Sequence, residues 1–237
     1  MMNLDNVLFI LVLYKVACKD SKAYQSLCAL LSREDLEGSL YIHDNTSCNI
    51  YLVGAYTQGY QVALQRGRKW VVFLDADTTI TQSYLDALKQ CISNGNFRVF
   101  APQLVSPDGK RLSPTKRYGI NVAFNSGMVM HTDAIRQIGG FNARYPLDYL
   151  DYYTCWQLQN HDIKIYPMDI SLVHHLSVED YTNVSQERYC SVLKAEKQFA
   201  IDTGRIWQYR LLLIARCCKW LLTNHKYTLI TIKHLFR

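Results

Sequence analysis

The sequence predicts an α/β fold with a mostly parallel central sheet flanked by helices. Three observations lead to this prediction. Short and continuously apolar runs, such as residues 7–13 and 70–74, are typical of strands buried on both faces. Stretches with helical spacing alternate with these runs, which favours right-handed β-α-β crossovers. A chain of 237 residues that is 49% hydrophobic can also bury a substantial core.

The expected elements follow one another in a regular order through the first half of the chain. The run from Val7 to Leu13 is the first strand, and Tyr24, Leu27 and Leu31 recur at helical spacing after it. The remaining expected strands are 40–43, 70–74, 99–102, 124–131, 164–167 and 171–175. The expected helices are 21–31, 54–66, 83–93, 132–138 and 151–159, and helices with basic residues follow from about residue 185. Residues 106–118 are expected to form a polar loop.

The net charge of +6 is unevenly placed along the chain. Residues 188–237 hold ten of the 26 Lys and Arg but two of the 20 Asp and Glu, a balance of +8, which leaves 1–187 at −2. A body so close to neutral argues against a nucleic-acid binder. We therefore expect a catalytic or binding domain over 1–187 and a basic, amphipathic helical tail over 188–237.

The cysteines and the apolar start indicate the compartment. The eight cysteines are spread singly apart from Cys217 and Cys218, and they form no C-x-x-C pattern. That spacing favours reduced thiols in a cytoplasmic protein over a disulfide scaffold. The run from Val7 to Leu13 is too short to span a bilayer and follows Asp5 rather than a basic segment. We interpret it as a buried strand.

Acidic residues follow two of the first three expected strands. Asp44 ends the second strand, and Asp75 and Asp77 end the third. In open α/β sheets ligands bind beyond the carboxyl ends of the strands, and carboxylates two residues apart can share one hard cation. Such a cation could neutralise a diphosphate. The first strand leads into Tyr14 and Lys15 rather than a glycine-rich loop, which disfavours dinucleotide-binding and P-loop enzymes. A solvated turn is the alternative interpretation of this acidic tripeptide.

Eight short motifs then occur in an order that resembles the family 2 glycosyltransferases, inverting enzymes of the GT-A fold, and among them short bacterial rhamnosyltransferase-like members. The motifs are Leu13-Tyr14, Asp44-Asn45-Thr46-Ser47, the small-residue segment 54–60, 73–77 with its D-x-D, Asn125-Ser126-Gly127, 138–142, 148–151 and Val173-His174-His175. The resemblance covers residues 7–177. It implies a nucleotide-binding half over about 1–103 and an acceptor-binding half over about 104–187.

The resemblance also implies roles for single residues. Tyr14 would stack on the nucleotide base, and Asp44 would accept a hydrogen bond from a pyrimidine imide. Asp75 would reach the ribose or a metal-bound water, and Asp77 would bind the divalent metal, Mn or Mg, directly. The donor would be a UDP- or dTDP-linked sugar.

The general base and the histidine ligand are each left with two candidates. Asp151 would be the base, and Asp148 lies one helical turn away as the alternative. At most one of His174 and His175 can face the site, because neighbouring strand residues point to opposite faces. Alignment to the family's usual V-x-H pattern favours His174 as the residue near the metal.

Each of these residues also has a purely structural interpretation. Tyr14 could simply finish a strand, and Asp44 could hold its own turn. Asp148 and Asp151 could simply stabilise a helix N-terminus by interacting with the helix macrodipole. Either histidine could be a core residue.

The chain departs from the family pattern at positions on both sides of the expected site. Thr57 stands where the family usually has Asn, and Tyr153 stands where an acid is common two residues beyond the base. Trp156 or Gln157 replaces a usual Arg. These changes keep open a non-catalytic relative that binds a glycan or a partner, and a nucleotidyltransferase is the other alternative.

The basic tail carries a segment suited to a membrane surface. Residues 206–222 combine Trp and Leu with Arg210, Arg216 and Lys219, so a spanning helix is not expected. A basic amphipathic helix of this kind is typical of peripheral contact with anionic lipid. We therefore expect 206–237 to place the protein at the inner face of the cell membrane. There it would act on glycan or lipid-linked acceptors in cell-surface polysaccharide synthesis. Helices that pack on the catalytic domain are the alternative.

Overall fold

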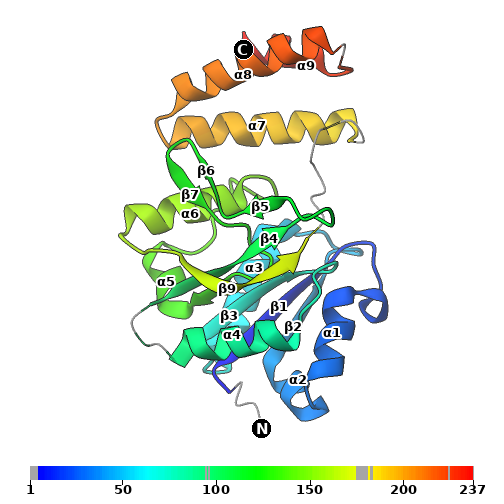
Figure 1. Cartoon of the computed structure of the whole chain (residues 1–237), viewed down its shortest axis with the longest axis vertical. Coiled ribbons are helices and arrows are strands. Elements are labelled where there is room, and N and C mark those ends of the chain that lie inside the picture. Colours follow the sequence, from blue (N-terminus) through cyan, green and yellow to red (C-terminus); the bar gives the residue numbers. More distant parts are fainter. Residues whose placement is uncertain are drawn as a thin grey trace. The chain divides into compact units, whose positions relative to one another are not determined.

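The computed structural model describes residues 5–93, 95, 97–174, 181, 184–223 and 225–236. The chain divides into two compact units, residues 1–175 and residues 176–237 (Figure 1). Each unit has its own core and is described by itself. The predicted boundary between catalytic domain and tail at residue 188 stays a prediction. The predicted nucleotide-binding and acceptor-binding halves, which meet at about residue 103, also stay predictions.

The first unit is built on a seven-stranded sheet with helices on its faces (Figure 1). Its strand order is β2-β1-β3-β8-β4-β5, and β9 also pairs with β4. Five of the seven strands run in one direction. The two exceptions are β8, which is antiparallel to β3 and β4, and β5, which is antiparallel to β4. The mostly parallel sheet flanked by helices is thereby confirmed. Its strands are β1 (Val7–Leu13), β2 (Leu40–Asp44), β3 (Trp70–Asp75), β4 (Val99–Val105), β5 (Arg111–Ser113), β8 (Val129–His131) and β9 (Tyr166–Val173).

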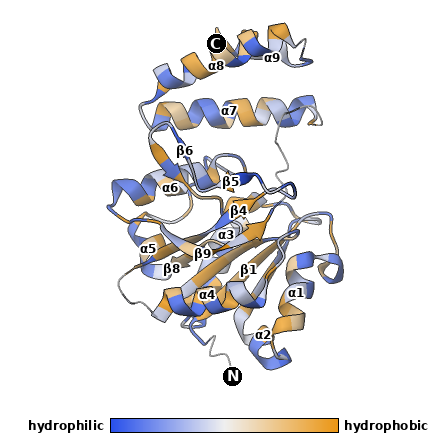
Figure 2. Ribbon diagram, in the orientation of Figure 1, coloured by the Kyte–Doolittle hydropathy of each residue, from blue (hydrophilic) through white to orange (hydrophobic). Residues whose placement is uncertain are grey.

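The apolar strands lie at the centre of the core, as their composition requires. All seven residues of β1 are buried, and β1 pairs in parallel with β2 on one side and β3 on the other. Figure 2 shows hydrophobic residues concentrated along the sheet. A central strand without polar alternation must be covered on both faces, since any exposed face would leave apolar area in water.

The helices of the first unit pack where small or apolar side chains meet the sheet. They are α1 (Lys22–Leu30), α2 (Arg33–Ser39), α3 (Tyr51–Gln65), α4 (Gln82–Ser93), α5 (Thr132–Gln137) and α6 (Leu150–Asn160), with a short 3-10 turn at Cys18–Asp20. In α3, a Cβ atom at Gly59 would lie 2.7 Å from Cδ1 of Ile10. The small residues of α3 therefore allow the helix to approach β1 closely.

Several elements differ from the sequence prediction. Helix α2 was not expected; Ser32 caps it by accepting a hydrogen bond from the Asp35 amide at 3.1 Å and donating one to its carboxylate. The expected polar loop contains β5 and the paired strands β6 (Thr115–Arg117) and β7 (Ile120–Val122). The strand expected over 124–131 is limited to β8. The two strands expected after residue 163 form one strand, β9, with an irregular register against β4.

The second unit consists of α7 (Gln186–Asp202), α8 (Ile206–Leu222) and α9 (Thr228–Leu235), which confirms the expected basic helices. Tyr189 lies at its centre, stacked on Tyr227 at 4.7 Å between ring centroids and hydrogen-bonded to Thr231 at 2.6 Å. The buried Glu196 carboxylate accepts two hydrogen bonds from Arg216, at 3.0 and 3.1 Å. Arg216 is therefore part of the core, although the sequence placed it on the basic face of the tail.

Candidate metal and nucleotide-sugar site

The register of the parallel strands brings the predicted acids to one edge of the sheet. Leu13 of β1 pairs with Asp44 of β2, and Val12 pairs with Asp75 of β3. Strand β9 runs parallel to β4, and His174 follows its last residue. Because all these strands end at the same edge, residues far apart in the sequence lie around one site.

Asp75, Asp77 and His174 form the centre of this site. One ligand atom from each residue can be chosen so that all three lie within 4.8 Å of one another. The His174 backbone amide donates to the Val105 carbonyl at 2.9 Å, which anchors the histidine to β4. Its Nδ1 atom is buried and has no hydrogen-bond partner among the described residues. A buried nitrogen without a partner is costly, and a metal ion would satisfy it. Two carboxylates and an imidazole fit a divalent cation such as Mn²⁺ or Mg²⁺.

Asp75 is held by hydroxyl groups that sequence reasoning did not assign to the site. Ser126 donates a hydrogen bond to Oδ2 of Asp75, and the Ser126 hydroxyl also lies 3.1 Å from that of Thr78. Burial raises the pKa of the Asp75 carboxyl, and the Ser126 hydrogen bond and His174 oppose that rise. Hydrogen bonds of this kind orient a carboxylate for metal binding.

The turn that carries Ser126 depends on the glycine after it. Gly127 has a φ of +73°, and a Cβ atom there would lie 2.7 Å from Leu172. Its amide donates to the Phe73 carbonyl at 2.8 Å, which fixes the turn against β3. The Asn125-Ser126-Gly127 motif was the signal for this contact, but its geometry requires the fold.

Asp151 lies at the N-terminal end of α6 with the electrostatics of a general base. Its Oδ1 accepts a hydrogen bond from the Tyr152 amide at 2.8 Å. Burial raises the pKa of Asp151 to about 7, and the charges of Asp148 and Asp75 add to the rise. Asp148 is half-buried beside it. A carboxylate that titrates near neutral pH can accept a proton from an acceptor hydroxyl.

Tyr56 is a further polar group at the site that the sequence did not indicate. Its side chain is fully buried, with its ring 4.5 Å from that of Phe73 and 5.6 Å from that of Phe141. Its hydroxyl has no hydrogen-bond partner in the described part of the chain. Burial raises the pKa of Tyr56 well above its usual value, and the charges of Asp75 and Asp151 contribute. The Tyr56 hydroxyl therefore stays protonated and keeps its hydrogen to donate.

The two residues predicted to bind the nucleotide base lie at the outer end of the site. Tyr14 is 51% exposed, and the Lys15 ammonium lies over its ring, 5.0 Å from the centroid. Asp44 is exposed, and its Oδ1 accepts a hydrogen bond from the Thr46 amide at 2.8 Å. Hydrogen bonds from the Thr46 hydroxyl and amide lower the pKa of Asp44. The other predicted metal candidate, His175, lies outside the described residues.

The positions that depart from the family pattern have structural partners of their own. The Thr57 hydroxyl donates to the Val53 carbonyl of its own helix at 2.8 Å. Tyr153 stacks on Tyr145, with ring centroids 4.6 Å apart, and lies 5.3 Å from the ring of Trp156. Aromatic side chains therefore pack together at the positions of α6 that depart from the family pattern.

Comparison with known proteins identifies the fold. No family model and no curated protein matches the sequence. Among solved structures, GalNAc-T7 bound to UDP, GalNAc and Mn²⁺ is similar with a TM-score of 0.58 at 13% identity over 84% of this chain. The chain has a GT-A fold.

Two further structures support the GT-A fold. The catalytic domain of Drosophila β1,4-galactosyltransferase 7 gives a TM-score of 0.52 at 11% identity, covering 78% of this chain and 79% of that one. S. aureus TarS gives 0.50 at 12% identity, covering 83% of this chain and 39% of that one. The chain spans about half the length of GalNAc-T7, of which 48% is covered.

Proposed function

We propose that the protein is a metal-dependent glycosyltransferase. It would move a sugar from a nucleotide-diphosphate donor to a hydroxyl of a glycan or lipid-linked glycan, with inversion, in cell-surface polysaccharide synthesis. The observation that carries the proposal is the convergence of Asp75, Asp77 and His174 at the carboxyl edge of a GT-A sheet, with the raised pKa of Asp151 nearby. The fold alone hosts more than one chemistry, so the argument depends on these side chains.

The donor would lie along the edge from β2 to β9. The exposed Tyr14 ring offers a face for the base, and the Asp44 carboxylate has a second oxygen that can accept from a pyrimidine imide. UDP- and dTDP-linked sugars both carry that imide. The diphosphate would then reach Asp77 and His174.

Asp77 and His174 would hold the divalent metal, with Asp75 beside them in the same cluster. When bound, the metal would act as a Lewis acid that stabilises the leaving nucleotide diphosphate. The Ser126 hydroxyl would keep the Asp75 carboxylate in place. The buried and unpartnered Nδ1 of His174 is the feature of this structure that favours a metal here over an ordinary acidic turn.

Asp151 would act as the general base on the acceptor. Its carboxylate takes the proton of the acceptor hydroxyl as that oxygen forms a bond to the anomeric carbon. The bond between the anomeric carbon and the diphosphate oxygen breaks on the opposite face, and its electron pair leaves with the nucleotide diphosphate. Direct displacement inverts the anomeric centre, and no second flanking carboxylate is needed.

The test compares the protein with its Asp77→Asn variant on a panel of UDP-, dTDP- and GDP-sugars, with Mn²⁺, with Mg²⁺ and with a chelator. Asp86→Asn is the matched control, because Asp86 is an exposed acid on α4 whose partners among the described residues, Gln82 and Lys89, belong to the same helix. We expect donor turnover that needs metal and is lost in Asp77→Asn but kept in Asp86→Asn. Donor binding without turnover would support a non-catalytic relative instead. Turnover that is the same with metal and with a chelator, and that is unchanged in Asp77→Asn, would contradict the proposal.

We also propose that the second unit contacts an anionic membrane at the inner face of the cell membrane through 206–237. Among the described residues, no helix is both long and apolar enough to cross a bilayer. Large apolar side chains are nevertheless exposed on α8 and α9, including Trp207 at 70% and Leu222 at 89%. Arg210 lies beside Trp207, with its guanidinium 5.3 Å from the ring centroid. Exposed Trp and Leu beside cations suit a lipid interface.

A flotation assay tests the membrane contact without damaging the core of the second unit. Trp207→Gln with Leu211→Gln removes exposed apolar side chains, and Leu64→Gln on α3 is the control at a comparably exposed position of the first unit. We expect binding to anionic vesicles but not neutral ones, and its loss in the double variant alone. Equal flotation of all three proteins would exclude the contact.

A further inference from the structure

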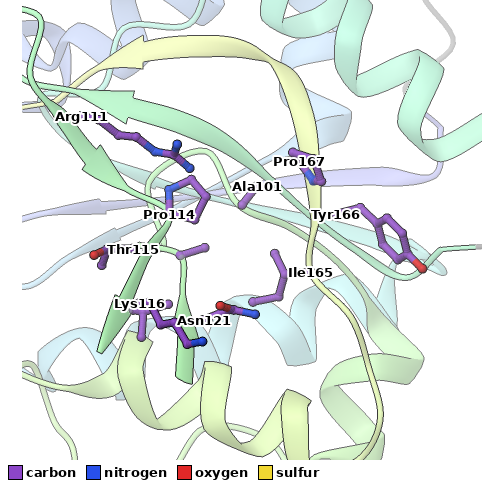
Figure 3. Close-up of a pocket in the computed structure, with 11 residues that line it drawn as sticks. Ala101, Arg111, Pro114, Thr115, Lys116, Asn121, Ile165, Tyr166 and Pro167 are labelled. Carbon is purple, nitrogen blue, oxygen red and sulfur yellow. The ribbon is translucent and has the colours of Figure 1, made fainter. Parts of the chain in front are cut away.

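A cavity of about 570 Å³ lies in the first unit between the β5–β6 segment, β7, β4 and the start of β9 (Figure 3). Its volume is within the range of small-molecule sites. Eleven residues line it: Ala101, Arg111, Pro114, Thr115, Lys116, Asn121, Val122, Ala123, Ile165, Tyr166 and Pro167.

The cavity runs from the start of β9 to the β5 strand beside the end of β4. Its lining includes Tyr166, the first residue of β9, whereas His174 follows the last residue of that strand. The eight residues of β9, at about 3.3 Å each, put roughly 20–25 Å between the two ends. The Tyr166 end of the cavity therefore lies far from the metal site. Its Arg111 end lies closer, because Arg111 pairs with Val105, whose carbonyl accepts the hydrogen bond from the His174 amide.

One side of the cavity is cationic. Arg111 from β5 and Lys116 from β6 both lie on this side, and the Arg111 guanidinium points over Pro114 (Figure 3). Within the described part of the chain, neither cation has an ion-pair partner. None of the eleven lining residues is acidic. Both side chains are exposed. Two cations beside one cavity, without an ion-pair partner among the described residues, create a positive potential that favours an anion there.

The other side of the cavity is apolar, with hydrogen-bonding groups at its margin. Ile165 and Pro167 face the cations across the cavity, while Thr115 and Asn121 supply a hydroxyl and an amide (Figure 3). The Tyr166 ring is turned aside and packs against Phe97 in a tilted arrangement, with centroids 3.6 Å apart. A ligand for this site needs an anionic group, hydroxyls and a compact body with a C–H face.

We infer that this cavity binds an acidic sugar, with its carboxylate or phosphate between Arg111 and Lys116 and its ring against Ile165 and Pro167. Arg111 can bind either anion in a bidentate manner, and Lys116 adds a second charge. The cavity shares β7 with the acceptor side of the first unit, where the Ala123 carbonyl accepts a hydrogen bond from the Cys155 thiol of α6 at 3.4 Å.

The inference is tested by saturation-transfer NMR on the full chain, with glucose 6-phosphate, glucuronate, glucose and inorganic phosphate as probes. A chelator is present and no nucleotide sugar is added, so the result does not depend on the metal site or on transferase activity. We expect one or both acidic sugars to bind, with affinity that falls as salt is added. Binding of glucose 6-phosphate alone identifies a phosphate site, and binding of glucuronate alone identifies a carboxylate site. Glucose that binds as tightly as the acidic sugars, or inorganic phosphate that binds as tightly as glucose 6-phosphate, would overturn the inference.

Variants locate the binding. Arg111→Gln and Lys116→Gln should each lower the affinity for the acidic sugar roughly tenfold, because each removes one charge-assisted contact. Lys22→Gln, at an exposed lysine on α1, should leave the affinity unchanged. Circular dichroism melting confirms that each variant is folded. Equal affinity for all four proteins would overturn the assignment of the site to this cavity.

Discussion

The hydroxyl of Ser126 donates a hydrogen bond to Oδ2 of Asp75, joining the turn before β8 to the end of β3. Ser126→Ala should lower the affinity for Mn²⁺ by about tenfold, because the carboxylate loses the contact that orients it. Titration calorimetry of the full chain measures this directly. Ser83→Ala, at an exposed position in α4, is the control and should bind Mn²⁺ like the unaltered protein. Unchanged affinity in Ser126→Ala would show that the hydrogen bond does not support a metal site.

The pKa of about 7 at Asp151 predicts how transfer depends on pH. A base must be ionised to accept a proton, so the rate should rise as the pH increases through about 7 and then level off. Asp151→Asn should lower the rate by about a hundredfold or more and abolish this dependence. Rates measured from pH 5 to pH 9 with saturating donor and metal would show both effects.

Asp148→Asn separates the two acids of this segment. The charge of Asp148 helps to raise the pKa of Asp151, so its removal should shift the rise in rate to lower pH while transfer continues. If Asp148→Asn abolished transfer and Asp151→Asn did not, Asp148 would be the base.

The same raised pKa has a consequence for stability. Between the ordinary pKa of 3.8 and about 7, the folded state holds the Asp151 proton more tightly than the unfolded chain does. Stability is therefore lost as the pH rises through this window, at about 1.4 kcal/mol for each pKa unit before solvent screening. Asp151→Asn removes this loss and should be more stable than the unaltered protein at pH 8. At pH 3.5 the difference should vanish, and urea unfolding at the two pH values tests it.

Tyr56→Phe should separate stability from activity. The Tyr56 hydroxyl is buried without a hydrogen-bond partner, so its removal should leave the melting temperature unchanged or slightly higher. Turnover of the nucleotide sugar should fall by roughly tenfold, because a buried hydroxyl that interacts electrostatically with Asp75 and Asp151 is lost. Tyr84→Phe is the contrast: that hydroxyl donates to the Gly127 carbonyl at 2.7 Å, and its loss should lower the melting temperature. A fall in stability for Tyr56→Phe would show that the hydroxyl is structural.

Glu196→Gln should destabilise the second unit, because it leaves Arg216 buried without its counter-charge. Burial alone would lower the pKa of Arg216, but the paired carboxylate raises it above its usual value, so the guanidinium stays charged. Breaking a buried ion pair from one side costs about 3–5 kcal/mol. Thermal unfolding and hydrogen exchange in α7 and α8 would measure the loss. Arg210→Gln, at an exposed position of α8, should have little effect.

Local patterns in the sequence were sufficient for the central strands and the acidic edge. The runs that form β1 and β3 can be stable only when buried on both faces, so their place in the sheet follows from composition. Asp44, Asp75 and Asp77 follow such strands, and parallel pairing then brings them to one edge. The acidic centre was therefore predictable before any contact was known.

Short elements and long-range contacts were not predictable in this way. The three-residue strands β5, β6 and β7 carry too few residues to show a period, and they form because neighbouring strands complete their hydrogen bonds. The polar loop expected in their place is in fact one side of the cavity that holds Arg111 and Lys116. The sequence likewise placed Arg216 on a solvated basic face. Its pairing with the buried Glu196 depends on the packing of α7 against α8, which the sequence pattern does not show.

The sequence by itself determined the α/β class, the uneven charge and the acids that follow the strands, because hydrophobic period and strand ends are local properties. Only the tertiary structure decided that Ser126 supports Asp75, that Tyr56 is buried beside two acids and that the pKa of Asp151 is about 7. It also decided that two cations of the β5–β6 segment face one cavity. Hydrogen bonding, desolvation and cavity shape depend on distances between residues far apart in the chain, and those distances exist only once the chain has folded.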